Sequence, residues 1–126
     1  MCGIIGYIGN ENASNLVIEG LKNLDYRGYD SWGIATQGNP SLQIIKEVGK
    51  IENCKHDNIK KSTLAIGHTR WATHGKVTKI NAHPHTSCDG KIAIVHNGIV
   101  ENYQELKKKL RNHKFVSETD SEIIVH

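Results

Sequence analysis

The stretch Met1-Cys-Gly-Ile-Ile-Gly-Tyr-Ile-Gly9 decides the fold, because it places a cysteine beside the initiator methionine at the start of an apolar segment. Alternating small and apolar residues are typical of a buried strand. Removal of Met1 would leave Cys2 with both a thiol and a free α-amine. The ordinary pKa of an α-amine is about 8 and that of a thiol is about 8.5, so the amine can accept the thiol proton at neutral pH. Cys2 is therefore a candidate nucleophile with its own base, and the alternative is an unreactive cysteine at a strand start.

The composition is that of one globular domain. The chain has 126 residues, of which 37% are hydrophobic and 23% are charged. Its 16 basic and 13 acidic residues leave a net charge of +3, which is too small to indicate a nucleic-acid or anionic-membrane partner. The basic residues at 107–109, 111 and 114 fall on one expected helix, where they form a solvent-facing side. No apolar run approaches the roughly 20 residues that cross a bilayer, so we also expect no membrane partner.

The cysteines indicate a reducing compartment. There are three of them, Cys2, Cys54 and Cys88, and an odd number cannot pair completely. No secretory signal precedes them, so a cytoplasmic protein is expected.

The apolar pattern predicts an alternation of strands and helices. Strands are expected at residues 1–9, 32–37, 42–48, 64–68 and 91–96, and helices at 12–24, 102–113 and from 119 onward. Asn12 or Ser14 could cap the first helix, while Asn102 with Glu105 and Thr119 with Glu122 fit the capping-box pattern. Residues 50–61 are polar and ambiguous. The chain stops within about two turns of the last helix, so we expect an N-terminal piece of a longer domain.

Polar residues gather where the expected strands end. His68-Thr-Arg-Trp-Ala-Thr-His-Gly75 follows one strand and has more polar and aromatic side chains than a core needs, which indicates a functional loop. Asn81-Ala-His-Pro-His85 continues this loop, and His96-Asn-Gly98 closes another strand.

These residues fit acyl transfer from an amide. Attack of the Cys2 sulfur on a carboxamide forms an oxyanion, which the Asn97 side chain and the Gly98 N–H could stabilise. Arg70 could hold a carboxylate in bidentate fashion and Asp120 an ammonium group, as in a free amino acid. Taken singly, Asn97-Gly98 could be a tight turn, Asp120 a first-turn acid at a helix dipole, and Arg70 an exposed ion pair beside Trp71. Their occurrence together with Cys2 favours the catalytic interpretation.

Six motifs resemble those of the N-terminal glutaminase domain of the glutamine:fructose-6-phosphate amidotransferase (glucosamine-6-phosphate synthase) family, within the class II glutamine amidotransferases. The Met-Cys-Gly-Ile-Ile-Gly start resembles the whole class. The more specific motifs are Tyr26-Arg-Gly-Tyr-Asp-Ser31, His68–Gly75, Asn81–His85, His96–Gly98 and Ser117-Glu-Thr-Asp-Ser-Glu122, in the order that the family has them. The likeness spans nearly the whole chain.

The resemblance implies a fold and a set of roles. The fold would be α+β, a four-layer α/β/β/α sandwich of mostly antiparallel sheets of the N-terminal nucleophile hydrolase type, of which residues 1–126 are the N-terminal part. Cys2 would be the nucleophile, with Asn97 and Gly98 as the oxyanion hole. The residues that would bind L-glutamine are Arg70, Trp71, Thr73, His74, His83 and Asp120, with Trp71, Thr73 and His74 in a loop that closes over it.

The resemblance also implies partners. In the family, ammonia passes to a C-terminal sugar isomerase domain that binds fructose 6-phosphate, and the full-length enzymes form homodimers. No cofactor and no metal are expected.

Three other functions compete with this one. The glutaminase domain could belong to another class II amidotransferase, or the fold could be a non-catalytic regulatory domain. A metal-binding module is the third, since the chain has eight histidines and His83, His85 and Cys88 could bind zinc. No Cys-x-x-Cys or spaced second pair completes a tetrahedral site for it.

Overall fold

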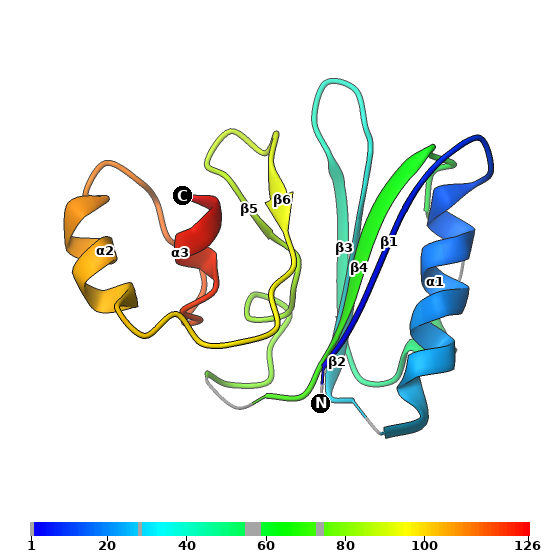
Figure 1. The fold of residues 1–126 in the computed structure, drawn as a ribbon, viewed down its shortest axis with the longest axis horizontal. Helices are drawn as coiled ribbons and strands as arrows, with labels where there is room; N and C mark the ends of the chain where they lie inside the picture. The colour runs from blue at the N-terminus through cyan, green and yellow to red at the C-terminus, as the bar shows by residue number, and fades with distance from the viewer. Residues whose placement is uncertain (1, 28, 55–58, 73–74) are drawn as a thin grey trace.

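The protein is built in four layers, as Figure 1 shows. The computed structural model describes residues 2–27, 29–54, 59–72 and 75–126. Helix α1 (Ala13–Leu24) covers a four-stranded sheet, a two-stranded sheet follows, and helices α2 (Tyr103–Lys109) and α3 (Glu122–Val125) form the fourth layer. Short 3-10 helices occupy Asp25–Arg27 and Ile51–Asn53.

The large sheet is antiparallel throughout, with the strand order β1-β4-β2-β3. Its strands are β1 (Gly3–Ile8), β2 (Ser31–Thr36), β3 (Gln43–Val48) and β4 (Leu64–Arg70). The small sheet pairs β5 (His85–Thr86) with β6 (Ala93–Ile94), also antiparallel. Strand β4 lies between β1 and β2, so the first strand of the chain is at one edge of the sheet.

The core lies between α1 and the large sheet. Val17, Ile18 and Leu21 of α1 are fully buried against Trp32 and Ile34 of β2. Helix α1 approaches β4 closely at Gly67, where an added Cβ would lie 2.6 Å from Val17 Cγ1 and 2.7 Å from Leu21 Cδ1. The glycine is therefore required by packing at this point of contact.

Alternation along the strands separates two faces of the large sheet. Gly67 of β4 faces α1. His68 and Arg70 therefore share the opposite face, which is turned toward the small sheet. Gly33 of β2 also faces that side, because a Cβ added there would meet the backbone carbonyl oxygen of His83. The space between the two sheets is thus lined by polar side chains of β4.

Most of the expected elements are present, with different ends. Strand β4 continues to Arg70 rather than ending at residue 68, while β6 and α2 are shorter than the expected segments 91–96 and 102–113. The segment that contains Asn81–His85 was expected to be loop, but its last residue begins β5.

The expected helix caps are wrong. Neither Asn12 nor Asn102 makes a side-chain cap hydrogen bond, and Ser14 Oγ instead donates to the carbonyl oxygen of Lys60 at 2.7 Å. Thr119 and Glu122 do not form a capping box, because α3 begins only at Glu122. The Glu122 carboxylate accepts hydrogen bonds from the backbone N–H groups of Val116 and Ser117, at 2.8 and 2.7 Å, and so orders the turn before the helix.

None of the helices in the described parts of the chain is both long enough and apolar enough to span a bilayer.

Candidate active site

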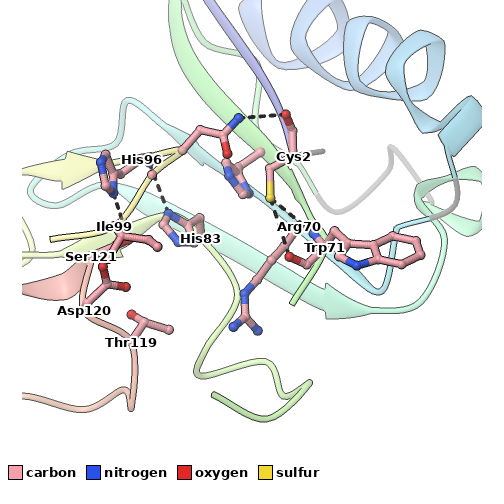
Figure 2. A pocket seen from close by; sticks show the side chains of 12 residues that line it. Cys2, Arg70, Trp71, His83, His96, Ile99, Thr119, Asp120 and Ser121 are labelled. Carbon is pink, nitrogen blue, oxygen red and sulfur yellow. Dashed lines mark hydrogen bonds between the residues drawn. The ribbon is translucent and has the colours of Figure 1, made fainter. Parts of the chain in front are cut away.

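A cavity of about 340 Å³ opens between the two sheets beside the N-terminus (Figure 2). Its lining comes from the residue before β1, the end of β4, the segments before β5 and after β6, and the segment before α3. The lining residues are Cys2, His68, Arg70, Trp71, His83, His96, Asn97, Gly98, Ile99, Thr119, Asp120 and Ser121.

Strand register places Cys2 at this cavity. Gly3 pairs with Thr69, so Cys2 comes opposite Arg70 at the end of the β1–β4 ladder. Both backbone polar groups of Trp71 contact the sulfur. The Trp71 N–H donates to Cys2 Sγ at 3.3 Å, and the thiol lies 3.7 Å from the Trp71 carbonyl oxygen.

Asn97 reaches the same strand end from the other sheet. Its side-chain Nδ2 donates to the backbone carbonyl oxygen of Cys2 at 2.9 Å, which Figure 2 draws as a dashed line. An asparagine amide carries two N–H bonds, so the second can donate to a substrate oxygen. Gly98 follows directly, and an added Cβ there would lie 3.0 Å from His96 Nε2. A side chain at this position would therefore crowd the His96 ring, whereas glycine allows a close approach to the backbone.

The opposite side of the cavity is the turn before α3. The Asp120 carboxylate accepts a hydrogen bond from the N–H of Val100, and Ser121 Oγ lies 3.0 Å from His96 Nδ1. In Figure 2, Thr119, Asp120 and Ser121 lie across from Cys2, and the Arg70 side chain extends from the Cys2 side into the space between them. A cation and an anion therefore line one small cavity together with a thiol.

Arg70 is held in place although it is charged. The residue is only 5% exposed, and its guanidinium donates to the carbonyl oxygen of Lys76 at 3.2 Å. The chain beyond it is fixed by Asp30, whose carboxylate accepts hydrogen bonds from the Ala72 N–H and from Ser31 Oγ. The Tyr26–Ser31 motif thus positions the loop that follows β4.

Three histidine rings cluster between the sheets, and two of them, His68 and His83, also line the cavity. The rings of His68 and His83 are parallel with centroids 4.4 Å apart, and His85 meets His83 edge-on at 4.5 Å. Burial, with the nearby Arg70 charge, lowers the pKa of His68 to about 4. Burial also lowers the pKa of His83 to about 2 and that of His85 to about 3. All three rings are therefore neutral at pH 7, and none serves as a general acid there.

The structure brings the predicted residues together wherever it describes them. Cys2, Arg70, Trp71, His83, Asn97, Gly98 and Asp120 all line the cavity. Thr73 and His74 lie outside the described residues. Trp71 contacts the Cys2 sulfur through its backbone, and the residue is 51% exposed.

Sequence reasoning assigned no role to five further lining residues: His68, His96, Ile99, Thr119 and Ser121. In the sequence, His96 and Ser121 are the direct neighbours of Asn97 and Asp120. Their position in the same two motifs could therefore have identified them as site residues.

A family profile described as "Glutamine amidotransferase domain" matches residues 52–126, which is more than half of the chain. The chain belongs to this glutamine amidotransferase domain family. Two curated relatives named glutamine–fructose-6-phosphate aminotransferase (isomerizing) are similar along its whole length. The protein of Pyrococcus horikoshii is 56% identical and that of Thermus thermophilus is 52% identical, each over 131 residues. The chain spans 22% of the length of each relative, or about a fifth.

Two solved structures have the same fold as this glutamine amidotransferase domain. The glutamine phosphoribosylpyrophosphate amidotransferase of B. subtilis superposes with a TM-score of 0.79 at 29% identity. A structure described as the allosteric regulatory enzyme of purine biosynthesis gives a TM-score of 0.81 at 30% identity. Both matches cover all of this chain and 28% and 29% of the other. The predicted fold, an α/β/β/α arrangement of the N-terminal nucleophile hydrolase type, is confirmed.

Proposed function

We propose that this glutamine amidotransferase domain hydrolyses L-glutamine to glutamate and ammonia through a thioester on Cys2. The observation that carries the proposal is the meeting of five chemically matched residues in one cavity: Cys2, Arg70, Asn97, Gly98 and Asp120. They come from segments as far apart as residues 2 and 120, and a core has no need of such a set. The competing idea of a non-catalytic domain offers no reason for it.

The proposed reaction begins at the sulfur. After removal of Met1, the α-amine of Cys2 takes the thiol proton, and the thiolate attacks the side-chain carboxamide carbon of glutamine. The oxyanion that forms receives hydrogen bonds from the second N–H of Asn97 and from the Gly98 N–H. The amine then gives its proton to the departing nitrogen, ammonia leaves, and water hydrolyses the thioester to glutamate.

Glutamine would be held by its α-carbon groups at the two charged residues. The Arg70 guanidinium fits the α-carboxylate, because its planar fork binds both oxygens. The Asp120 carboxylate fits the α-ammonium. Thr119 and Ser121 flank Asp120 and line the same cavity.

We further propose that the chain is the N-terminal part of the glutaminase domain of a glutamine–fructose-6-phosphate aminotransferase. The 56% and 52% identities to relatives of that name, together with the 22% share of their length, support this assignment. Ammonia would then be used by a C-terminal sugar isomerase domain acting on fructose 6-phosphate, in a cytoplasmic homodimer.

Substitution of the nucleophile tests the proposal. In the purified full-length protein, Cys2→Ala should abolish glutamate release from glutamine while the thermal unfolding temperature stays near that of the wild type. The matched control is Cys54→Ala, since Cys54 packs at the core beneath α1 and burial raises the pKa of its thiol, which keeps it protonated. Retained glutamate release by Cys2→Ala would overturn the proposal.

Retention of Met1 gives a second test with no side-chain change. An acylated nitrogen is not basic, so protein that keeps Met1 should release no glutamate. Mass spectrometry of the N-terminus, performed on preparations of graded activity, should show activity proportional to the fraction of chains that begin at Cys2.

A further inference from the structure

We propose that Cys88, His113 and His126 form a zinc site on the far side of the small sheet, separate from the proposed active site. The ligand atoms of these three residues lie within 4.8 Å of one another. Cys88 Sγ is 3.8 Å from His113 Nδ1 and 3.6 Å from His126 Nδ1. A tetrahedral Zn²⁺ ion with ordinary bond lengths holds a thiolate sulfur and an imidazole nitrogen about 3.6 Å apart. Both sulfur–nitrogen distances are therefore close to the spacing that zinc requires.

These ligands differ from those that the sequence suggested. His83 and His85 are the histidines nearest to Cys88 in the sequence, but they belong to the stack between the sheets. His83 Nδ1 accepts the backbone N–H of His96, and His85 Nε2 lies 2.9 Å from Thr119 Oγ1. The structure replaces them with two histidines that lie 25 and 38 residues beyond Cys88.

Glu122 fixes the orientation of the His126 ring. Its Oε1 lies 3.3 Å from His126 Nε2, and both side chains are only 1% exposed. The Glu122 carboxylate is itself held by hydrogen bonds from Ser117 Oγ and from the Val116 N–H. The other ring nitrogen of His126, Nδ1, faces Cys88 Sγ at 3.6 Å.

Several groups converge on the Cys88 sulfur. Two ring nitrogens, those of His113 and His126, face it. The sulfur also accepts the backbone N–H of Lys114 at 3.4 Å. A carboxylate that orients a ligating histidine through its other nitrogen is the usual second partner in zinc sites, and Glu122 stands in that position toward His126.

Zinc at this place would be structural and would cross-link two layers of the fold. Cys88 belongs to the turn between β5 and β6, His113 follows α2, and His126 ends α3, so the ion would join the third and fourth layers of Figure 1. His113 and His126 also bracket Thr119, Asp120 and Ser121, which line the cavity. The site would thereby fix the segment that we propose binds the glutamine amine, without contacting substrate.

Metal analysis of the purified full-length protein tests the proposal. Zinc titration against a chromogenic chelator should give one tightly bound Zn²⁺ per chain. Cys88→Ser should weaken binding at least tenfold, and so should His113→Gln, whose exposed position allows the variant to fold. Replacement by Co²⁺ should produce a thiolate-to-cobalt charge-transfer absorption that Cys88→Ser lacks.

Two control variants identify the site. Cys54→Ala should keep the zinc, since Cys54 lies at the core beneath α1. Cys2→Ala should also keep it, which separates this site from zinc chelated by the thiol and amine of the N-terminal cysteine. Loss of zinc in Cys2→Ala with retention in Cys88→Ser would overturn the proposal, and so would a wild-type protein that binds no zinc in the titration.

Discussion

The side chain of Asn97 is hydrogen-bonded to the backbone carbonyl oxygen of Cys2 at 2.9 Å, across 95 residues of sequence. This contact joins the segment after β6 to the start of β1, so the small sheet and the large sheet meet at the cysteine. The residue that would stabilise the oxyanion is thereby fixed against the residue that would carry it. Preorganisation of this kind lowers the cost of ordering donors during the reaction.

Loss of the Asn97 amide should affect the chemical step. We expect Asn97→Ala to lower kcat for glutamate release by about 100- to 1,000-fold, because one oxyanion donor contributes about 2.7 to 4 kcal/mol. The KM for glutamine should change much less, since the donor acts mainly in the transition state. Steady-state kinetics separate the two, and a change confined to KM would place Asn97 in ground-state binding instead.

Arg70→Lys tests the carboxylate site. An ammonium cannot reproduce the planar fork, so the KM for glutamine should rise about tenfold or more. Because Arg70 is buried and donates to the Lys76 carbonyl, unfolding should be measured beside the kinetics. Lys79→Arg, at an exposed ion pair with Glu47, is a control that should leave KM unchanged. An unchanged KM in Arg70→Lys would place the carboxylate elsewhere.

The stability of the protein should be sensitive to an added side chain at Gly33, where the two sheets approach each other. A Cβ there would overlap the His83 carbonyl oxygen and lie 2.9 Å from that of Ile45, so Gly33→Ala should destabilise the protein by about 1 to 3 kcal/mol. Gly6→Ala is the matched control in another strand of the same sheet. Its added Cβ would have its nearest neighbour, Ile66 Cγ2, at 3.7 Å, so the change should stay within about 1 kcal/mol of neutral. Urea unfolding of both variants measures the difference, and equal effects would contradict the close approach.

The histidine stack predicts loss of stability in acid. The folded pKa values of His68, His83 and His85 are about 4, 2 and 3, all below the ordinary value of 6.5. The unfolded chain therefore binds more protons below pH 6.5, and the free energy of unfolding should fall as the pH decreases from 6.5 toward the folded values. Each ring contributes up to about 1.4 kcal/mol per pH unit.

Urea unfolding between pH 7 and pH 5 checks this dependence. In His85→Gln, the slope of the unfolding free energy against pH should decrease by the equivalent of about one proton, because one of the three buried rings is gone. The glutamine can still meet Thr119 Oγ1, which His85 Nε2 contacts at 2.9 Å. A free energy of unfolding that stays constant over this range would contradict neutral buried imidazoles.

Local patterns in the sequence predicted much of the fold. The alternation in residues 1–9 and the apolar stripe of residues 12–24 reproduce β1 and α1 closely, because each element has one face on the core. The short strands β5 and β6 were poorly predicted. With two residues each, they have too few positions to show an alternation, and their partner strand defines them.

The cap predictions failed for a different reason. Glu122 fits a capping box in the sequence, yet its carboxylate accepts hydrogen bonds from Val116 and Ser117 and lies near His126. A buried carboxylate takes whichever donors the tertiary structure places around it, and a four-residue pattern does not specify them.

The sequence by itself determined the chemical groups: a cysteine that can carry its own base, an Asn-Gly pair, an arginine and an aspartate, all in recognisable motifs. Only the tertiary structure decided which groups meet. The β1–β4 register sets Cys2 opposite Arg70, the packing of two sheets brings Asn97 to Cys2, and the turn before α3 closes the cavity with Asp120. Side-chain chemistry is a property of single residues, whereas proximity depends on strand pairing and layer packing between segments far apart in the chain. For the same reason Cys88 lies beside His113 and His126 rather than its sequence neighbours.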